Sequence, residues 1–332
     1  MRPTTARLTD AALLGAFATV TTIAVVAAGP GDVASDIGHR LTTGLGFMIS
    51  VTSLFLVAVL MTLEHIFPAR EEERGFSPSM AFDALYLLIQ LPVMAVALAL
   101  LTSPISNWLS ANASFLVLDS TRELPMLVLL VLGVALSDFF LWFSHLVRHK
   151  VKFLWRFHMI HHSQTRLSLF TASRDHPFDS MFEAFIRLMP LVFLFPTIVE
   201  NAQALVLYGL GVSWHIRFTH TNLRTNLGPL RYILVTPQSH RIHHSSEPEH
   251  WNSNYANVFC WDRLFGLQHA DDTSYPTTGV NDVNFPEPKT LSPKAFAAAY
   301  LAQLRFPFDE EAVKRATHGS PPVTANDQAL AA

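Results

Sequence analysis

Residues 124–149 read LPMLVLLVLGVALSDFFLWFSHLVRH, an apolar run that leads directly into two histidines, His145 and His149. A helix needs roughly 20 consecutive apolar residues to cross the hydrocarbon core of a bilayer. The run from Leu124 to Phe143 meets that requirement. We therefore predict a membrane helix that ends in a pair of imidazoles at the membrane surface.

Working outward from this run, three other stretches are long and apolar enough to be membrane helices. They lie at about Ala11–Ala28, Leu45–Leu63 and Ala84–Leu101, and a weaker pair at about Phe182–Val199 and Ala202–Phe218 is expected to dip into the membrane and return. The first run follows Arg2 and Arg7, as the apolar region of a signal peptide also would. A retained helix is favoured because more spans follow it.

The composition agrees with a membrane protein. Half of the residues are hydrophobic and only 15% are charged, whereas soluble domains carry about a quarter charged residues. The net charge of −3 predicts no nucleic-acid partner, and a single cysteine, Cys260, excludes a disulfide framework or a thiolate metal site.

Lysine and arginine in the short loops predict the orientation of the chain in the membrane. With the N-terminus inside, the inner segments carry eight basic residues and the outer loops carry only Arg40 and Arg122. Four spans then return the chain to the cytoplasmic side just before the histidines begin. We expect a multi-pass protein of a bacterial-type cytoplasmic membrane, with its polar chemistry on the cytoplasmic face.

The histidines are concentrated in one region of the chain. Eleven of the 16 lie between His145 and His244. They form one H-x-x-x-H pair (His145, His149) and two H-x-x-H-H triplets (His158, His161, His162 and His240, His243, His244), with His176, His215 and His220 between them. The remaining five, His39, His65, His250, His269 and His318, are interpreted as ordinary surface or core residues.

The spacing of these histidines has a geometric meaning. Residues three and four apart share one face of a helix, so His145 and His149 point the same way. Adjacent residues such as His161 and His162 diverge by about 100°. One triplet can therefore offer nitrogens to two different metal ions, and the number of imidazoles exceeds what one metal takes.

Imidazole is a ligand for Zn, Cu, Fe and Ni alike, so the residues alone leave the metal open. A zinc hydrolase typically has three protein ligands and an H-E-x-x-H helix, and the sequence has no H-E-x-x-H. A transmembrane haem needs only single axial histidines. A metal carrier would need polar residues within the spans, and the first three spans carry almost no charge.

Metal-bound imidazoles usually donate their other N–H to a carboxylate or a carbonyl group. Asp138 lies seven residues before His145, two helical turns away on the same face, and is predicted to support the metal ligands together with Asp262. Asp175, Asp179 and Glu183 are further candidates.

At these positions the sequence resembles the fatty acid hydroxylase / sterol desaturase superfamily. The resemblance runs from about Ser137 to Gly266 and rests on the three histidine motifs, His176-Pro177, His220-Thr221-Asn222, Asn254-Tyr255 and Trp261-Asp262-Arg263-Leu264-Phe265-Gly266. It implies metal ligation by nine residues: His145, His149, His158, His161, His162, His220, His240, His243 and His244. His176 and His215 are additional candidate ligands.

The resemblance also implies an architecture and a reaction. The fold is expected to be all-α, a polytopic bundle of about four transmembrane helices and a re-entrant pair, with a cytosolic histidine-rich cap. The expected enzyme holds two iron ions and hydroxylates or desaturates a lipid such as a fatty acyl chain or a sterol. It would use O2 and electrons from NAD(P)H through a small carrier, cytochrome b5-like or ferredoxin-like. Asp179 and Leu267 stand where members often have glutamate and threonine, which leaves the lipid subclass open.

Three regions are predicted along the chain. Residues 1–123 hold N-terminal transmembrane helices, residues 124–270 form the two-metal catalytic domain, and residues 271–332 comprise a loop, a short amphipathic helix over 292–305 and a disordered tail. A membrane zinc-dependent lipid hydrolase remains the alternative function, and metal analysis together with the O2 dependence of turnover separates the two.

Overall fold

The computed structural model describes residues 35, 37–42, 46, 50–112, 119–194, 202–271, 273–282 and 284–317. These residues form helices and loops, and their only β-type pairings are three isolated bridges, Pro68 with Leu223, Leu234 with Phe259 and Ser245 with Thr278. The all-helical prediction is therefore correct for the described part of the chain. The predicted first span and the predicted tail beyond Thr317 lie outside the described residues.

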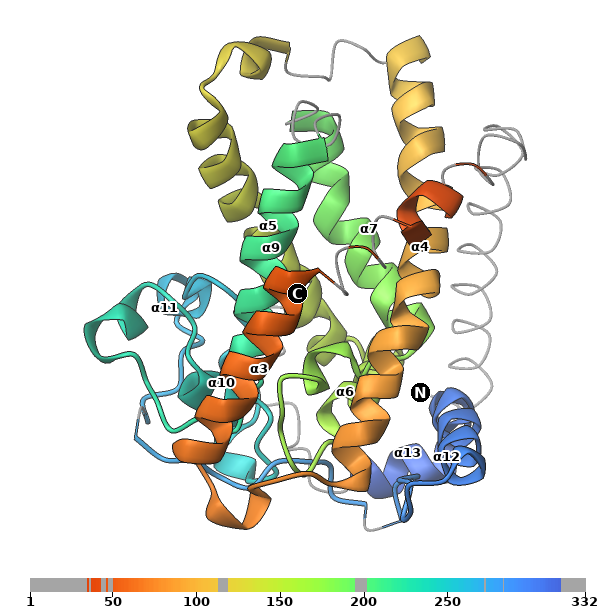
Figure 1. The fold of residues 1–332 in the computed structure, drawn as a ribbon, viewed down its shortest axis with the longest axis vertical. Coiled ribbons are helices and arrows are strands. Elements are labelled where there is room, and N and C mark those ends of the chain that lie inside the picture. The colour runs from red at the N-terminus through yellow and green to blue at the C-terminus, as the bar shows by residue number, and fades with distance from the viewer. Residues whose placement is uncertain are drawn as a thin grey trace. The chain divides into compact units, whose positions relative to one another are not determined.

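The long apolar helices are α4 (Pro78–Asn112) and α5 (Met126–Lys150), shown in gold and olive in Figure 1. Among the described residues, two helices are long and apolar enough to cross a membrane, Pro78–Val96 within α4 and Met126–Lys150. They overlap the predicted spans at Ala84–Leu101 and Leu124–Phe143. Helix α3 (Val51–Ile66) is apolar but shorter, so the count of four spans stays a prediction.

The weaker apolar pair forms two separate helices, α7 (Pro177–Leu194) and α9 (Ala202–Thr219). The re-entrant path predicted for this pair is not tested by the helices themselves. Helix α7 begins at Pro177, where the missing N–H costs nothing because the first turn of a helix has no partner for it.

The chain divides into two compact units. The first comprises residues 1–55, 88–144 and 177–212, and the second comprises 56–87, 145–176 and 213–332. The second unit contains all nine predicted ligands. Its own helices are α6 (Lys152–His162), α10 (Pro237–His243), α11 (Trp261–Phe265), α12 (Pro293–Arg305) and α13 (Glu310–Thr317). The same unit contains five short 3₁₀-helices among its described residues, at Glu71–Glu73, Thr171–Ser173, Gly228–Tyr232, Pro248–His250 and Phe306–Phe308.

Helix α6 is anchored by its apolar face. Met159 and Ile160 are fully buried and pack with Phe285, Phe306 and Val313 from the C-terminal region. Burial of an aliphatic side chain of this size contributes roughly 1.5–3 kcal/mol. Met159 and Ile160 lie on one side of the helix, and His158, His161 and His162 lie on the other. Packing of the apolar side therefore fixes the direction of the histidines.

Helix α12 corresponds to the predicted amphipathic helix at 292–305. Ser292 caps it by accepting the N–H of Ala295 at 3.1 Å, and Pro293 opens its first turn. Its apolar side packs on Phe82 and Tyr86 of α4. The Tyr86 hydroxyl donates to Oε1 of the fully buried Gln303 at 2.6 Å, so this helix is part of the core of the second unit.

Candidate metal centre

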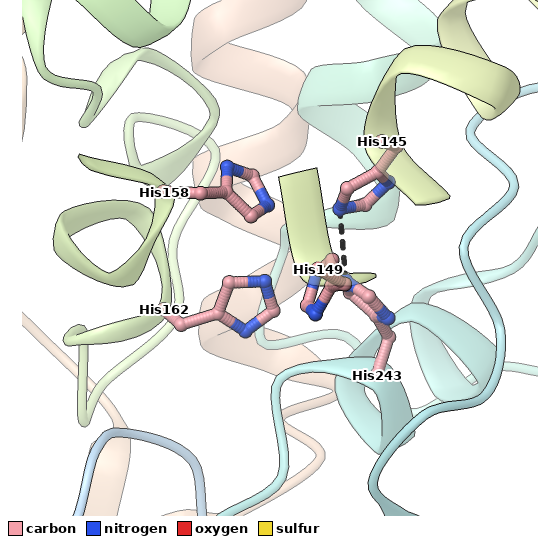
Figure 2. A group of neighbouring side chains, drawn as sticks. All are labelled: His145, His149, His158, His162 and His243. Atoms are coloured by element: carbon pink, nitrogen blue, oxygen red, sulfur yellow. Dashed lines mark hydrogen bonds between the residues drawn. The ribbon is translucent and has the colours of Figure 1, made fainter. Parts of the chain in front are cut away.

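The nine predicted ligands are brought together in two groups. His145, His149, His158, His162 and His243 form the first group, in which one nitrogen from each ring lies within 4.8 Å of the others. Figure 2 shows these five rings turned toward a common centre. His161, His220, His240 and His244 form the second group by the same criterion.

Helix geometry explains how the histidines are divided. The pairs four residues apart, His145/His149, His158/His162 and His240/His244, each stay within one group. The middle histidine of each triplet, three residues after the first, enters the other group, so His161 leaves His158 and His243 leaves His240. Each triplet thus contributes to both groups, which is the arrangement that its spacing predicted.

The two groups are neighbours. The ring centroids of His162 and His244, one from each group, are 4.3 Å apart with an interplanar angle of 21°. The adjacent His161 and His162 diverge, with ring planes at 78°. Two ions held by these groups would therefore lie close to each other, separated by stacked imidazoles.

Proton positions in the first group favour a cation between the rings. His145 Nδ1 lies 2.6 Å from the Tyr255 carbonyl oxygen, and His243 Nδ1 lies 2.9 Å from the Ser253 carbonyl oxygen. A carbonyl only accepts, so both Nδ1 atoms carry the proton and both Nε2 atoms present a lone pair. Yet these two Nε2 atoms are only 2.9 Å apart. Two lone pairs at that distance repel unless a cation binds both.

The second group shows the same conflict. His220 Nδ1 donates to the Ile216 carbonyl at 2.7 Å, and His161 Nδ1 lies 3.3 Å from a carboxylate oxygen of Asp175. Their Nε2 lone pairs face each other at 3.1 Å. His240 Nε2 lies 3.0 Å from His220 Nε2 and 3.2 Å from His244 Nε2. A shared cation again accounts for nitrogens that face one another.

Four of the Nε2 separations run from 2.9 to 3.2 Å. Two nitrogens that each lie about 2.1 Å from one ion would be about 3.0 to 3.4 Å apart. Each of these pairs is therefore close enough to share a cation.

For five of these rings, burial favours the neutral form that a metal ligand needs. Burial lowers the pKa of His243 to about 3. Burial also holds the pKa values of His158, His162, His240 and His244 well below the ordinary value, and neighbouring histidines and Arg148 add to the effect. The Nε2 atoms of His149 and His162 are buried and have no hydrogen-bond partner among the described residues. A bound cation would satisfy them.

His158 differs from the other members of the first group. Arg148, itself buried, lies with Nη1 3.3 Å from His158 Nδ1. A guanidinium only donates, so this contact uses the Nδ1 lone pair and leaves the proton on Nε2. Binding of a metal through Nε2 of His158 therefore requires the Arg148 contact to break.

The two additional candidate ligands lie outside both groups. His176 Nε2 is 3.3 Å from the Leu304 carbonyl and its ring packs on Phe157. His215 Nε2 is 3.1 Å from the Val235 carbonyl. In both residues a ring nitrogen is thus engaged by a backbone carbonyl.

The carboxylates predicted to support the ligands have different surroundings. Asp138 is fully buried in α5, and its role toward the histidines stays a prediction. Asp262 Oδ2 accepts the N–H of Ala256 at 2.6 Å. That contact holds the residue after Tyr255, whose carbonyl orients His145. Asp175, a further candidate, lies beside His161.

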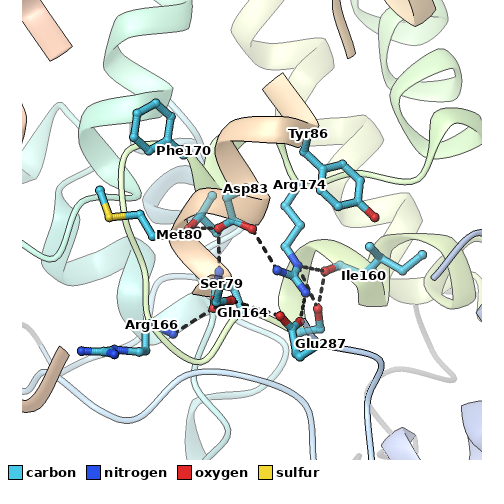
Figure 3. A network of polar contacts seen from close by, with 12 residues as sticks. Ser79, Met80, Asp83, Tyr86, Ile160, Gln164, Arg166, Phe170, Arg174 and Glu287 are labelled. Atoms are coloured by element: carbon cyan, nitrogen blue, oxygen red, sulfur yellow. Dashed lines mark hydrogen bonds and ion pairs between the residues drawn. The ribbon is translucent and has the colours of Figure 1, made fainter. Parts of the chain in front are cut away.

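An ion network that the sequence did not reveal holds the C-terminal end of α6 (Figure 3). Arg174 is fully buried; its Nη1 donates to Asp83 at 2.8 Å, and its Nη2 pairs with Glu287. Its Nε lies 3.3 Å from the Ile160 carbonyl and 3.1 Å from the Ser163 hydroxyl, both at the end of α6. The one available signal was Asp83, an acidic residue at the edge of a predicted span.

A second buried arginine supports the other triplet. Arg241, between His240 and His243, donates from Nη2 to Glu73 at 2.8 Å and to the Asn222 amide oxygen at 3.0 Å. Helix α10 itself begins with a capping box, in which Thr236 accepts the N–H of Ser239 and Ser239 accepts the N–H of Thr236. The two H-x-x-H-H triplets therefore share one sequence motif, but different contacts hold their helices: the Arg174 network holds α6, and the capping box and Arg241 hold α10.

The described residues thus form a helical protein with two helices long and apolar enough to cross a membrane and two adjacent histidine groups that could each hold a metal ion. Residues 130–267 match the family model for fatty acid hydroxylase. The match covers the region that carries the histidine motifs, so the predicted resemblance to this family is confirmed there.

Named relatives agree with the family. The chain is 32% identical to ornithine lipid hydroxylase OlsE of Rhizobium tropici over 194 residues, which is 57% of this chain and 53% of that protein. It is 37% identical to alkylglycerol monooxygenase of Xenopus tropicalis over 132 residues, covering 39% of this chain and 28% of the relative. The human alkylglycerol monooxygenase is 32% identical over 154 residues, covering 46% and 33%.

The chain thus spans about half or less of the length of the relatives it matches. No solved structure matches it.

Proposed function

We propose that the chain is a membrane-bound di-iron oxygenase that hydroxylates a C–H bond of a lipid. It would use O2 and electrons from NAD(P)H delivered by a small electron-transfer protein. The observation that carries the proposal is the pair of neighbouring histidine groups whose Nε2 lone pairs face one another. Such sites call for two cations, and an all-imidazole donor set is suitable for iron.

The first ion would be held by His145, His149, His158, His162 and His243, and the second by His161, His220, His240 and His244. Bound iron would supply O2 activation and the attack on an unactivated C–H bond, for which amino-acid side chains have no chemistry of their own. The protein supplies the arrangement of donors and a largely dry enclosure, since eight of the nine rings are buried.

The side chains around the groups maintain the donor state of the rings. The carbonyl groups of Tyr255, Ser253 and Ile216 hold protons on the Nδ1 atoms of His145, His243 and His220. The Asp175 carboxylate lies 3.3 Å from Nδ1 of His161, where its charge would favour a proton on that nitrogen. Fixing the proton on Nδ1 keeps Nε2 available and fixes the plane of each ring.

The names of the relatives support a lipid substrate, because one is a lipid hydroxylase and the others are alkylglycerol monooxygenases. The apolar helices α4 and α5 support access to that substrate from a membrane. We favour hydroxylation over desaturation on the relatives' names, since both reactions begin with the removal of a hydrogen from carbon.

The electron carrier is expected to be acidic. We propose that it docks on the basic residues near the first triplet, Lys150, Lys152 and Arg156, whereas Arg166 of the same basic run lines a cavity. Arg148, which belongs to the same basic run in the sequence, is buried beside His158 and is removed from this surface. Long-range attraction between opposite charges accelerates such encounters and weakens with salt.

The test compares cells that make the wild-type chain with cells that make His162→Ala, grown with ¹⁸O2. We expect a lipid that is heavier by one oxygen atom derived from O2, present in the wild type and absent in the variant. The purified wild-type chain should contain iron. Zinc with O2-independent lipid cleavage would overturn the proposal in favour of a membrane zinc-dependent lipid hydrolase.

A further inference from the structure

A cavity of about 210 Å³ lies in the second unit, and none of the nine histidines of the two groups lines it. It is formed by the end of α3, the 3₁₀-helix Glu71–Glu73, the start of α4, the loop after the first triplet, and Asn222. Its apolar lining comes from Met61, Phe76, Met80 and Leu167. Apolar side chains of this kind suit the start of a hydrocarbon chain.

One carboxylate in the cavity has no cationic partner. Glu64 accepts the backbone N–H of Asn222 at 3.1 Å, and no described residue forms an ion pair with it. Glu73, in the same lining, is by contrast paired with Arg241 at 2.8 Å and with Arg70 at 3.0 Å. Burial raises the pKa of Glu64 to about 7, and an ammonium group placed beside it would favour its charged form.

One guanidinium in the cavity has no carboxylate partner. Arg166 donates from Nη2 to the Glu72 carbonyl at 2.9 Å, and among the described residues it forms no ion pair. Arg74, also in the lining, is paired with the exposed Glu71 at 3.4 Å. The same cavity thus contains one carboxyl group and one guanidinium that form no ion pair with a described residue.

One residue of the cavity lining, Asn222, connects the cavity to the segments that carry the second histidine group. Asn222, whose N–H bonds Glu64, lies two residues after His220. The Asn222 amide oxygen accepts from Arg241, which lies between His240 and His243. A ligand held at Glu64 would therefore be held by the same framework that positions the second group.

We propose that this cavity binds the head group of the lipid substrate and that the head group is zwitterionic. Its ammonium would lie at Glu64 and its anionic group, a carboxylate or a phosphate, at Arg166, with the hydrocarbon chain leaving along Met61 and Met80. This inference rests on the proposed function only in taking a lipid as the substrate. Charge-assisted hydrogen bonds at both ends give such a head group its selectivity.

The experiment measures binding without turnover, on the full chain in nanodiscs, with empty nanodiscs as background. Three single-chain probes with one acyl length are compared: lysophosphatidylethanolamine, its N-acetyl derivative, and an Nα-acyl-lysine. The first carries an ammonium and a phosphate, the second keeps only the phosphate, and the third carries an ammonium and a carboxylate. We expect the wild type to bind at least one zwitterion more tightly than the N-acetyl probe.

We expect Glu64→Gln and Arg166→Gln each to weaken binding of that zwitterion by about tenfold, whereas Glu64→Gln leaves the N-acetyl probe unaffected. Glu311→Gln and Arg263→Gln, at exposed positions outside the cavity, are matched controls and should bind as the wild type does. Equal binding of all three probes, or unchanged binding by both cavity variants, overturns the inference. Because no turnover is measured, either result leaves the oxygenase proposal to its own test.

Discussion

The two H-x-x-H-H triplets have the same spacing but different supports. Helix α6 has 11 residues and no side-chain cap at its N-terminus, and the fully buried Met159 and Ile160 anchor it to the C-terminal region. Helix α10 has 7 residues, begins with a capping box and is tied by Arg241 to Glu73. The comparison teaches that the spacing decides where the nitrogens point, while long-range contacts decide whether the short helices hold them there.

The largest effect is expected at the buried arginines. Replacing Arg174 by Met leaves the fully buried Asp83 without its cation and frees the end of α6. Removal of one partner from a buried ion pair costs about 3–5 kcal/mol. We expect a clear fall in the melting temperature of the purified protein, larger than for Arg241→Met, because Arg174 pairs with two carboxylates. Arg263→Met, at an exposed position, is the control, and an equal melting temperature in Arg174→Met and this control would contradict the account.

A smaller and more selective effect is expected at Asp175. The variant Asp175→Asn removes the carboxylate beside His161 Nδ1 while keeping its size. Loss of such an outer partner typically weakens metal binding by about 10- to 100-fold. Titration with a chelator should show one metal released earlier than in the wild type and the other unchanged. The matched variant Asp271→Asn, outside both groups, should release both metals as the wild type does; earlier release of both metals in Asp175→Asn would show that the groups are not separate.

The smallest effect is expected at the cap of α10. Thr236→Ala removes the acceptor of the Ser239 N–H and should cost about 1 kcal/mol. Thr236→Ser keeps the hydroxyl oxygen and should lose much less, as seen in the two melting temperatures. Since α6 begins without such a cap, a loss in Thr236→Ala as large as that in Arg174→Met would show that the cap, and not the ion pair, dominates the support of the histidines.

Sequence reasoning predicted the grouped histidines because their positions follow from helix geometry over a few residues. The division of His161 and His162 between two groups is a local property of adjacent residues on one helix. The acceptors that orient the rings were not predictable in this way. The Tyr255 carbonyl lies 110 residues from His145 along the chain, and any residue type can supply a carbonyl, so no side chain marks it.

The fold was predictable to a similar extent. The apolar run at Leu124–Phe143 and the amphipathic run at 292–305 were sufficient to place α5 and α12. The Arg174 network was not, because it joins Asp83, Glu287 and the end of α6 across up to about two hundred residues. Charged residues carry no periodic signal that would identify their partners.

The most direct test of the central claim is the number of metal ions per chain in three proteins: the wild type, His161→Ala and His162→Ala. His161 and His162 are adjacent in the sequence, but His161 belongs to the second group and His162 belongs to the first. We predict two ions per wild-type chain and one in each variant, with a different ion lost from each and none left in the double variant. One ion per wild-type chain, or the loss of the same ion in both single variants, would contradict the claim that the two groups are separate metal sites.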